Sequence, residues 1–172
     1  MRAIIFVILI FSLTSCGFHP RGKIPLAEPL HYLYLKTPDP YGQLTRNLRV
    51  FLKISGVHVT ASPQAADSIL SILSESTQEQ LIGINGTQDT RQYNLILTVI
   101  YTVLNKNQQV IVFPQTATET RTLTIKAGQM LAGSSEAKML YQQMRQAIVY
   151  DILNRLSSKD VTKMLLAKPN EN

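Results

Sequence analysis

Alternating side chains over Tyr93–Leu104 constrain the fold of this chain more than any other feature. One set is apolar throughout, whereas the set between its members mixes amides and hydroxyls with aliphatic residues. Because successive side chains of a strand point to opposite faces of a sheet, this pattern predicts a strand with one core face and one mixed face. The core face needs a covering layer, so we expect a sheet packed against helices.

Three further segments read as strands of the same sheet. Leu30–Lys36 is apolar on both faces for most of its length, which is typical of an interior strand. Ile69–Gln80, beginning near Ser68, is apolar at first and then polar, so its far end should reach water or a polar surrounding. Asn85-Gly86 then marks a tight reversal. Val110–Ile125 contains Pro114, which favours an edge strand or a bulge.

Two helices are expected. The first begins at Asp39-Pro40, an acceptor side chain followed by a proline suited to the first helical turn, and runs to about Ser55. Gly56 supplies the left-handed residue that ends it. A short extended piece follows at Val57-His58-Val59.

The second helix begins after Gly133, with Ser134 or Ser135 as its cap, and reaches about Leu156. Its apolar stripe predicts packing on a sheet. Residues 157–172 are expected to form a flexible C-terminal tail, frayed or holding a loosely docked short helix.

The predicted order is therefore β-α-β-β-β-α, an α+β fold with a four-stranded mixed sheet and both helices packed on one face. The opposite face carries small hydroxyls and amides studded with Ile96 and Ile100, and it is either an ordinary solvated surface or a docking surface. The residues expected on it are Asn94, Thr98, Thr102 and the threonines of Thr116–Thr124, among them Thr118, Thr120 and Thr122.

Cys16 closes the tetrapeptide Leu13-Thr14-Ser15-Cys16 after a basic start and a short apolar run. This resembles a bacterial lipoprotein signal, in which residues 1–15 are removed and the cysteine is lipidated. The alternative is an ordinary signal peptide with a chance cysteine. Residues 16–29 then read as a tether and residues 30–156 as a single domain. A lone cysteine cannot form an internal disulfide.

The chain carries a formal charge of +6, and removal of Arg2 with the signal leaves 16 basic against 11 acidic side chains, or about +5. Such an excess favours anionic partners. For an exported, lipid-tethered protein these are anionic lipid head groups or an acidic protein surface, not nucleic acid.

Candidate catalytic groups are scattered. His19, His31 and His58 show no ligand-like spacing, and Glu75 and Glu79 share a strand face. Four residues of strand separate the two glutamates by roughly 13 Å, too far for a catalytic pair. We therefore expect no enzyme activity, no metal site and no cofactor.

Several motifs together resemble the LptE family of lipopolysaccharide-assembly lipoproteins. They are the start Cys16-Gly17-Phe18-His19-Pro20-Arg21-Gly22, the turn Asp39-Pro40-Tyr41-Gly42 before a basic helix, the hairpin Asn85-Gly86 followed by Gln92-Tyr93, and a strand containing Thr98. The likeness spans nearly the whole chain after Cys16, and it rests on the order and spacing of these motifs.

This resemblance implies a two-helix, four-strand domain held by acyl chains on Cys16 at the inner leaflet of the outer membrane. Gly17 after the cysteine agrees with sorting to that membrane. The domain would plug the barrel protein LptD and assist lipopolysaccharide transport, with the threonine-rich face against the barrel wall. The alternative is a lipid-anchored scaffold of another outer-membrane machine, for barrel assembly or of the secretin type.

The basic residues that the resemblance implies for lipopolysaccharide contacts are only partly present in this sequence. Ile84 stands where some relatives carry a base, and the loop from Gly128 to Ser135 has no lysine. Arg91 and Lys126 are the nearest replacements for lipopolysaccharide-binding bases, and their alternative role is that of solvated charges at strand ends.

Overall fold

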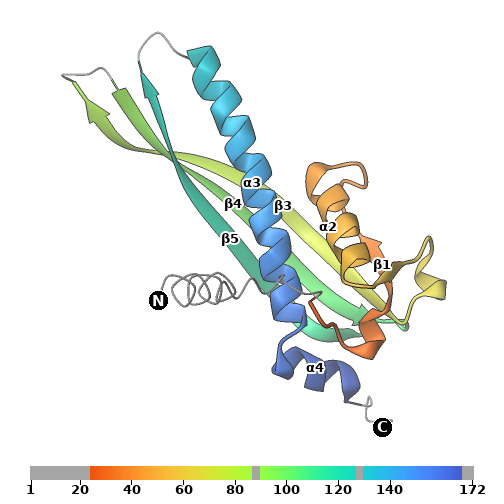
Figure 1. Cartoon of the computed structure of the whole chain (residues 1–172). Coiled ribbons are helices and arrows are strands. Elements are labelled where there is room, and N and C mark those ends of the chain that lie inside the picture. The colour runs from red at the N-terminus through yellow and green to blue at the C-terminus, as the bar shows by residue number, and fades with distance from the viewer. Residues whose placement is uncertain (1–23, 87–89, 127–129, 168–172) are drawn as a thin grey trace, which may run out of the picture.

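The computed structural model describes residues 24–86, 90–126 and 130–167. In this part of the chain five strands form one sheet, and three helices accompany it (Figure 1). The strands are β1 (Tyr32–Lys36), β2 (His58–Val59), β3 (Ser68–Asn85), β4 (Thr90–Asn105) and β5 (Val110–Lys126), and the helices are α2 (Gln43–Ile54), α3 (Met130–Leu156) and α4 (Lys159–Leu166).

The sheet is mixed, as predicted, with the strand order β2-β1-β3-β4-β5. β1 pairs in parallel with both β2 and β3, and β3, β4 and β5 pair antiparallel. The interior position of β1 is therefore confirmed. The count of four strands is wrong, because His58 and Val59 pair with Tyr32 and Leu33 as a two-residue edge strand.

Pro114 lies in an edge strand and beside a register irregularity, the two features that this proline favours. β5 is an edge strand, and its register against β4 shifts between Tyr101 and Val103, opposite the segment that holds this proline. The reversal after β3 joins Asn85 to its partner Thr90, and residues 87–89 of this connection lie outside the described residues.

Helix α2 begins later than expected, at Gln43. Asp39 does not cap it; its carboxylate accepts a bond from the Tyr41 amide at 3.1 Å and its carbonyl accepts one from the Gly42 amide at 3.2 Å, so the segment forms a turn before the helix. The predicted stop is confirmed, because Gly56 has φ +85, a conformation that residues with a Cβ rarely adopt.

Helix α3 begins earlier than expected, at Met130, so Ser134 and Ser135 lie inside the helix instead of capping it. Gly133 is not a boundary but a contact residue: a Cβ at this position would lie 2.8 Å from Cδ1 of Ile125. The missing side chain lets the first turns of α3 approach the end of β5.

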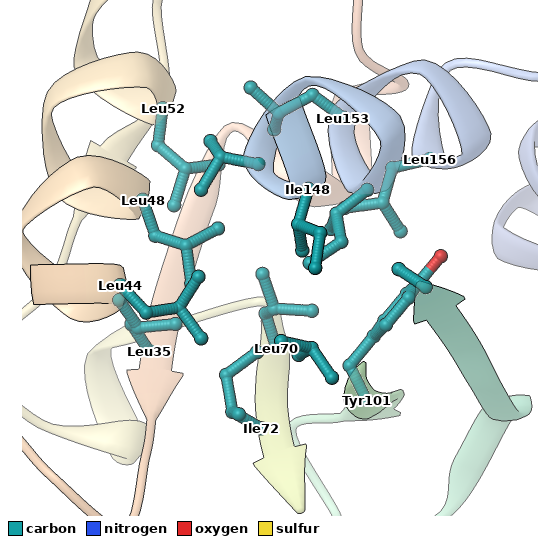
Figure 2. Packing of buried hydrophobic residues seen from close by; sticks show 14 of the residues in the cluster. Leu35, Leu44, Leu48, Leu52, Leu70, Ile72, Tyr101, Ile148, Leu153 and Leu156 are labelled. Carbon is teal, nitrogen blue, oxygen red and sulfur yellow. The ribbon is translucent and has the colours of Figure 1, made fainter. Parts of the chain in front are cut away.

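The core lies between the sheet and the helices α2 and α3, which pack on the same face (Figure 2). Leu48 of α2, Ile148 of α3 and Leu70 of β3 are almost completely buried. Figure 2 shows these side chains converging from the two helices and the strands, with Tyr101 of β4 pointing toward Leu156. Burial of each such side chain contributes roughly 1.5 to 3 kcal/mol.

The two ends of the domain are more ordered than the sequence indicated. Within the expected flexible tail, Lys159–Leu166 forms α4, so the count of two helices is wrong, and Leu165 is buried. Within the expected tether, Leu26 is buried and its carbonyl lies 3.2 Å from Nε2 of His31. The signal segment and Cys16 lie outside the described residues.

Candidate functional site

The three long strands present a polar surface on the side of the sheet opposite α2 and α3, which we call the open face. Leu95, Leu97 and Val99 of β4 point into the core, so the residues between them point the other way. The pairing of β3, β4 and β5 aligns these outward residues in rows across the sheet: Gln80-Asn94-Thr122, Gln78-Ile96-Thr120, Ser76-Thr98-Thr118 and Ser74-Ile100-Thr116.

Hydroxyl and amide groups contact one another along these rows. The hydroxyl of Thr122 donates to Oδ1 of Asn94 at 3.1 Å, and the hydroxyls of Thr98 and Thr118 lie 3.4 Å apart. Thr116, Thr118, Thr120, Thr122 and Thr124 are all exposed. The structure thus brings together on one surface the residues that the alternation predicted would share it.

Thr102 is the exception among these residues. It is buried, and its hydroxyl donates to the carbonyl of Val112 at 2.6 Å. The register shift between Tyr101 and Val103 lies at this residue. Thr102 therefore supports the irregular strand pairing and does not add an exposed hydroxyl to the open face.

Arg91 and Lys126 lie at the far end of the long strands. Arg91 pairs with Ile125, and Lys126 pairs with Thr90. Both side chains are exposed. Since side chains alternate along a strand, Lys126 continues the threonine row of the open face, whereas Arg91 lies on the side that carries α3. The two bases share one end of the sheet but not one face.

A groove of about 900 Å³ lies on the helix side, between the start of α2, the first half of α3 and the outer part of β3. Leu44, Ile72, Leu123 and Ile125 supply its apolar lining. Across it, Nε of Arg145 donates to Oε1 of Glu75 at 2.6 Å, which ties α3 to β3. The groove thus combines an apolar floor with a partly shielded ion pair.

Tyr141 lines the same groove. Burial raises the pKa of its hydroxyl, and the negative charge of Glu79 raises it further. The hydroxyl therefore stays protonated at neutral pH. Glu75 and Glu79 do share a strand face, and that face is the one toward α3, so the partner of Glu75 is Arg145 and not another acid.

Arg145 is the groove residue that the sequence did not single out. A cation beside the apolar stripe of α3 was one available signal, and the glutamates among the core-facing positions of β3 were the other. Neither signal identified the partner, because Glu75 and Arg145 are 70 residues apart in the chain.

The described histidines have structural partners. His31 contacts the Leu26 carbonyl, and the ring of His58 stacks on Tyr32 with centroids 5.4 Å apart. In the described ranges no three His, Cys, Asp or Glu side chains meet in an arrangement that could hold a metal ion. None of the helices described is both long and apolar enough to cross a bilayer.

Comparison with known proteins gives a consistent match. A family model described as "LptE: Lipopolysaccharide-assembly" matches residues 30–156. The chain is 30% identical over 143 residues to an LPS-assembly lipoprotein LptE of Pectobacterium atrosepticum, covering 83% of this chain and 77% of the relative. It is 31% identical over 143 residues to the protein of that name from Yersinia enterocolitica, covering 83% and 68%.

Solved structures show the same fold. Lipoprotein B from Nitrosomonas europaea superimposes with a TM-score of 0.68 at 22% identity, covering 84% of this chain and 93% of that one. Rare lipoprotein B from Shewanella oneidensis gives a TM-score of 0.64 at 25% identity, covering 75% and 96%.

Proposed function

Because the chain belongs to the LptE family of lipopolysaccharide-assembly lipoproteins, we propose that it is the lipid-anchored plug and assembly partner of an LptD-type outer-membrane barrel. In this proposal the acyl chains on Cys16 hold the protein at the periplasmic side of the outer membrane. Several acyl chains make such anchoring firm, whereas one chain binds only marginally. The protein acts through binding and has no catalytic role.

The open face is the observation that carries the proposal. Its four rows hold threonine, serine, glutamine and asparagine together with Ile96 and Ile100, and no position in these rows carries a charged side chain. Large outer-membrane barrels have polar interiors, so a polar, uncharged sheet surface is suited to lie against such a wall. The exposed hydroxyls can then bond to wall side chains or to bridging water.

Co-purification tests this function. A tag is placed after Asn172, the membranes are solubilised mildly, and the recovered proteins are identified. We expect a large LptD-type barrel in near-equal amount with the tagged chain. Recovery of another outer-membrane assembly without such a barrel contradicts the proposal.

Direct lipopolysaccharide binding forms a second part of the proposal, with Arg91 and Lys126 as the residues that contact its phosphates. Both are exposed, and the chain has a net charge of +6. Because the two bases lie on opposite faces, each contributes separately. We expect each single alanine variant to weaken binding of purified lipopolysaccharide by the isolated protein, and unchanged affinity in both removes them from the site.

A further inference from the structure

The outer edge of β5 is a row of main-chain groups without a neighbouring strand in the part of the chain that the structure describes. β5 spans 17 residues and is the last strand of the sheet, paired on one side with β4. The main-chain N–H and C=O groups directed away from β4 are spaced for pairing with another strand.

Natural edge strands are protected by prolines, bulges or charges that prevent such pairing. In β5 the proline is at position 114, near one end, and pairing with β4 continues without a shift from Gln115 to Lys126. The charges within this stretch, Glu119 and Arg121, are opposite in sign and form an ion pair at 3.4 Å. The edge is therefore regular and carries no net charge between Gln115 and Ile125.

We propose that the edge of β5 over Gln115–Ile125 binds an extended segment of the barrel partner as an added strand. This inference rests on the proposed function and specifies one of its contacts. Strand addition gains affinity from main-chain hydrogen bonds, and the side chains on alternate positions determine which segment fits. Here the threonine row of the open face favours a segment with small polar residues at alternate positions.

The position of α3 favours a single extended segment over a second copy of this chain. α3 packs on β5 more extensively than on any other strand, and Gly133 brings it against Ile125. Neighbouring strands are about 4.8 Å apart, whereas a helix with its side chains is roughly 10 Å wide. Antiparallel pairing of β5 with β5 of a second copy would bring both α3 helices onto the same face beside the shared edge, where their side chains compete for the same space.

Proline substitution at adjacent positions tests the edge. Successive N–H groups of a strand alternate between the two sides, so one of the variants Thr118→Pro and Glu119→Pro removes a bond to β4 and the other removes an outward N–H. The tagged full-length protein is purified from membranes that contain the LptD-type barrel. Glu119→Ala controls for the lost charge.

We expect one proline variant to keep the thermal stability of the wild type and to recover about tenfold less barrel, while Glu119→Ala recovers a normal amount. The other proline variant should lose stability. If the stable variant recovers the barrel as well as the wild type does, the strand proposal is wrong and the proposed function stands. If the wild type itself recovers no barrel, both are wrong.

Hydrogen exchange gives a second readout that does not depend on a foldable variant. Alternate amides within Thr116–Thr124 should exchange fast in the free protein and become protected in the purified complex. Amides of β4, which has a strand on each side, should change little. Equal exchange of the β5 amides in the free and bound protein contradicts the added strand.

Discussion

At the scale of single residues, Tyr101 combines two unusual properties. It is almost fully buried in the core, and its hydroxyl has no hydrogen-bond partner among the residues that the structure describes. Burial raises its pKa from 10.0 to about 12. A hydroxyl buried without a partner costs free energy on folding. The hydroxyl of Tyr101 therefore offsets part of the stability that burial of its aromatic ring provides.

The raised pKa predicts a loss of stability in alkali. Between pH 10 and 12 the folded state keeps the Tyr101 proton that the unfolded chain has released, so the free energy of unfolding falls as pH rises through this window. The free energy of unfolding, measured with denaturant, should fall between pH 8 and 11.5 by about 2 kcal/mol more in the wild type than in Tyr101→Phe. The variant should be at least as stable at pH 8. Equal alkaline losses contradict the prediction.

Gly56 gives a second residue-scale prediction with a matched control. At both Gly56 and Gly86 an added Cβ meets no atom of the described residues within 4 Å, but Gly56 has φ +85. We expect Gly56→Ala to lower the free energy of unfolding by about 1 kcal/mol. Gly86→Ala should change it by less than about 0.5 kcal/mol. Similar losses at both sites in denaturant titrations would show that the left-handed backbone is not the cause.

At the scale of elements, the sequence predicted what depends on local periodicity. The long strands follow from alternation, and the interior position of β1 follows from apolar residues on both of its faces. The sequence predicts only an extended piece at His58 and Val59, and these two residues form the strand β2 through pairing with Tyr32 and Leu33, which no local pattern reveals. The sequence predicts a helix at α4 only as one alternative to a frayed tail, because Leu165 is its only buried residue and its apolar pattern is short.

In the candidate site, too, some features follow from the local sequence pattern and others depend on tertiary structure. The open face was predictable because alternation assigns Asn94, Thr98 and the β5 threonines to one side. The burial of Thr102 was not, since it depends on a local register shift. The groove and its Glu75–Arg145 ion pair depend on how α3 crosses β3, a tertiary arrangement that sequence spacing does not contain.

Helix α4 supports a prediction at this scale. The Ser158 hydroxyl accepts a bond from the Val161 amide at 3.4 Å and so caps the helix. We expect Ser158→Ala to destabilise α4 by about 1 kcal/mol, and Ser158→Asp to preserve it because aspartate caps equally well. Amide exchange at Lys163–Leu166 reports this change. Faster exchange in both variants, or in neither, contradicts a capping role.

At the scale of the whole molecule, the two faces of the sheet should differ in their tolerance of bulk and charge. Thr120 on the open face and Val50 on α2 are both exposed. Arginine at either position should change stability by less than about 0.5 kcal/mol. Thr120→Arg should reduce recovery of the barrel, because a large charged side chain separates the open face from the wall, while Val50→Arg should leave recovery unchanged. Equal recovery with both variants would argue against contact through the open face.

Helix α3 also has a mechanical consequence. Its 27 residues span about 40 Å and run beside the long strands, from the tight contact of Gly133 with Ile125 to the core at Leu156 (Figure 1). A three-stranded ribbon alone bends and twists easily. Contacts with α3 near both ends of the helix limit this bending. We therefore expect the far end of β3, β4 and β5 to hold its direction relative to the core better than a ribbon without α3 would.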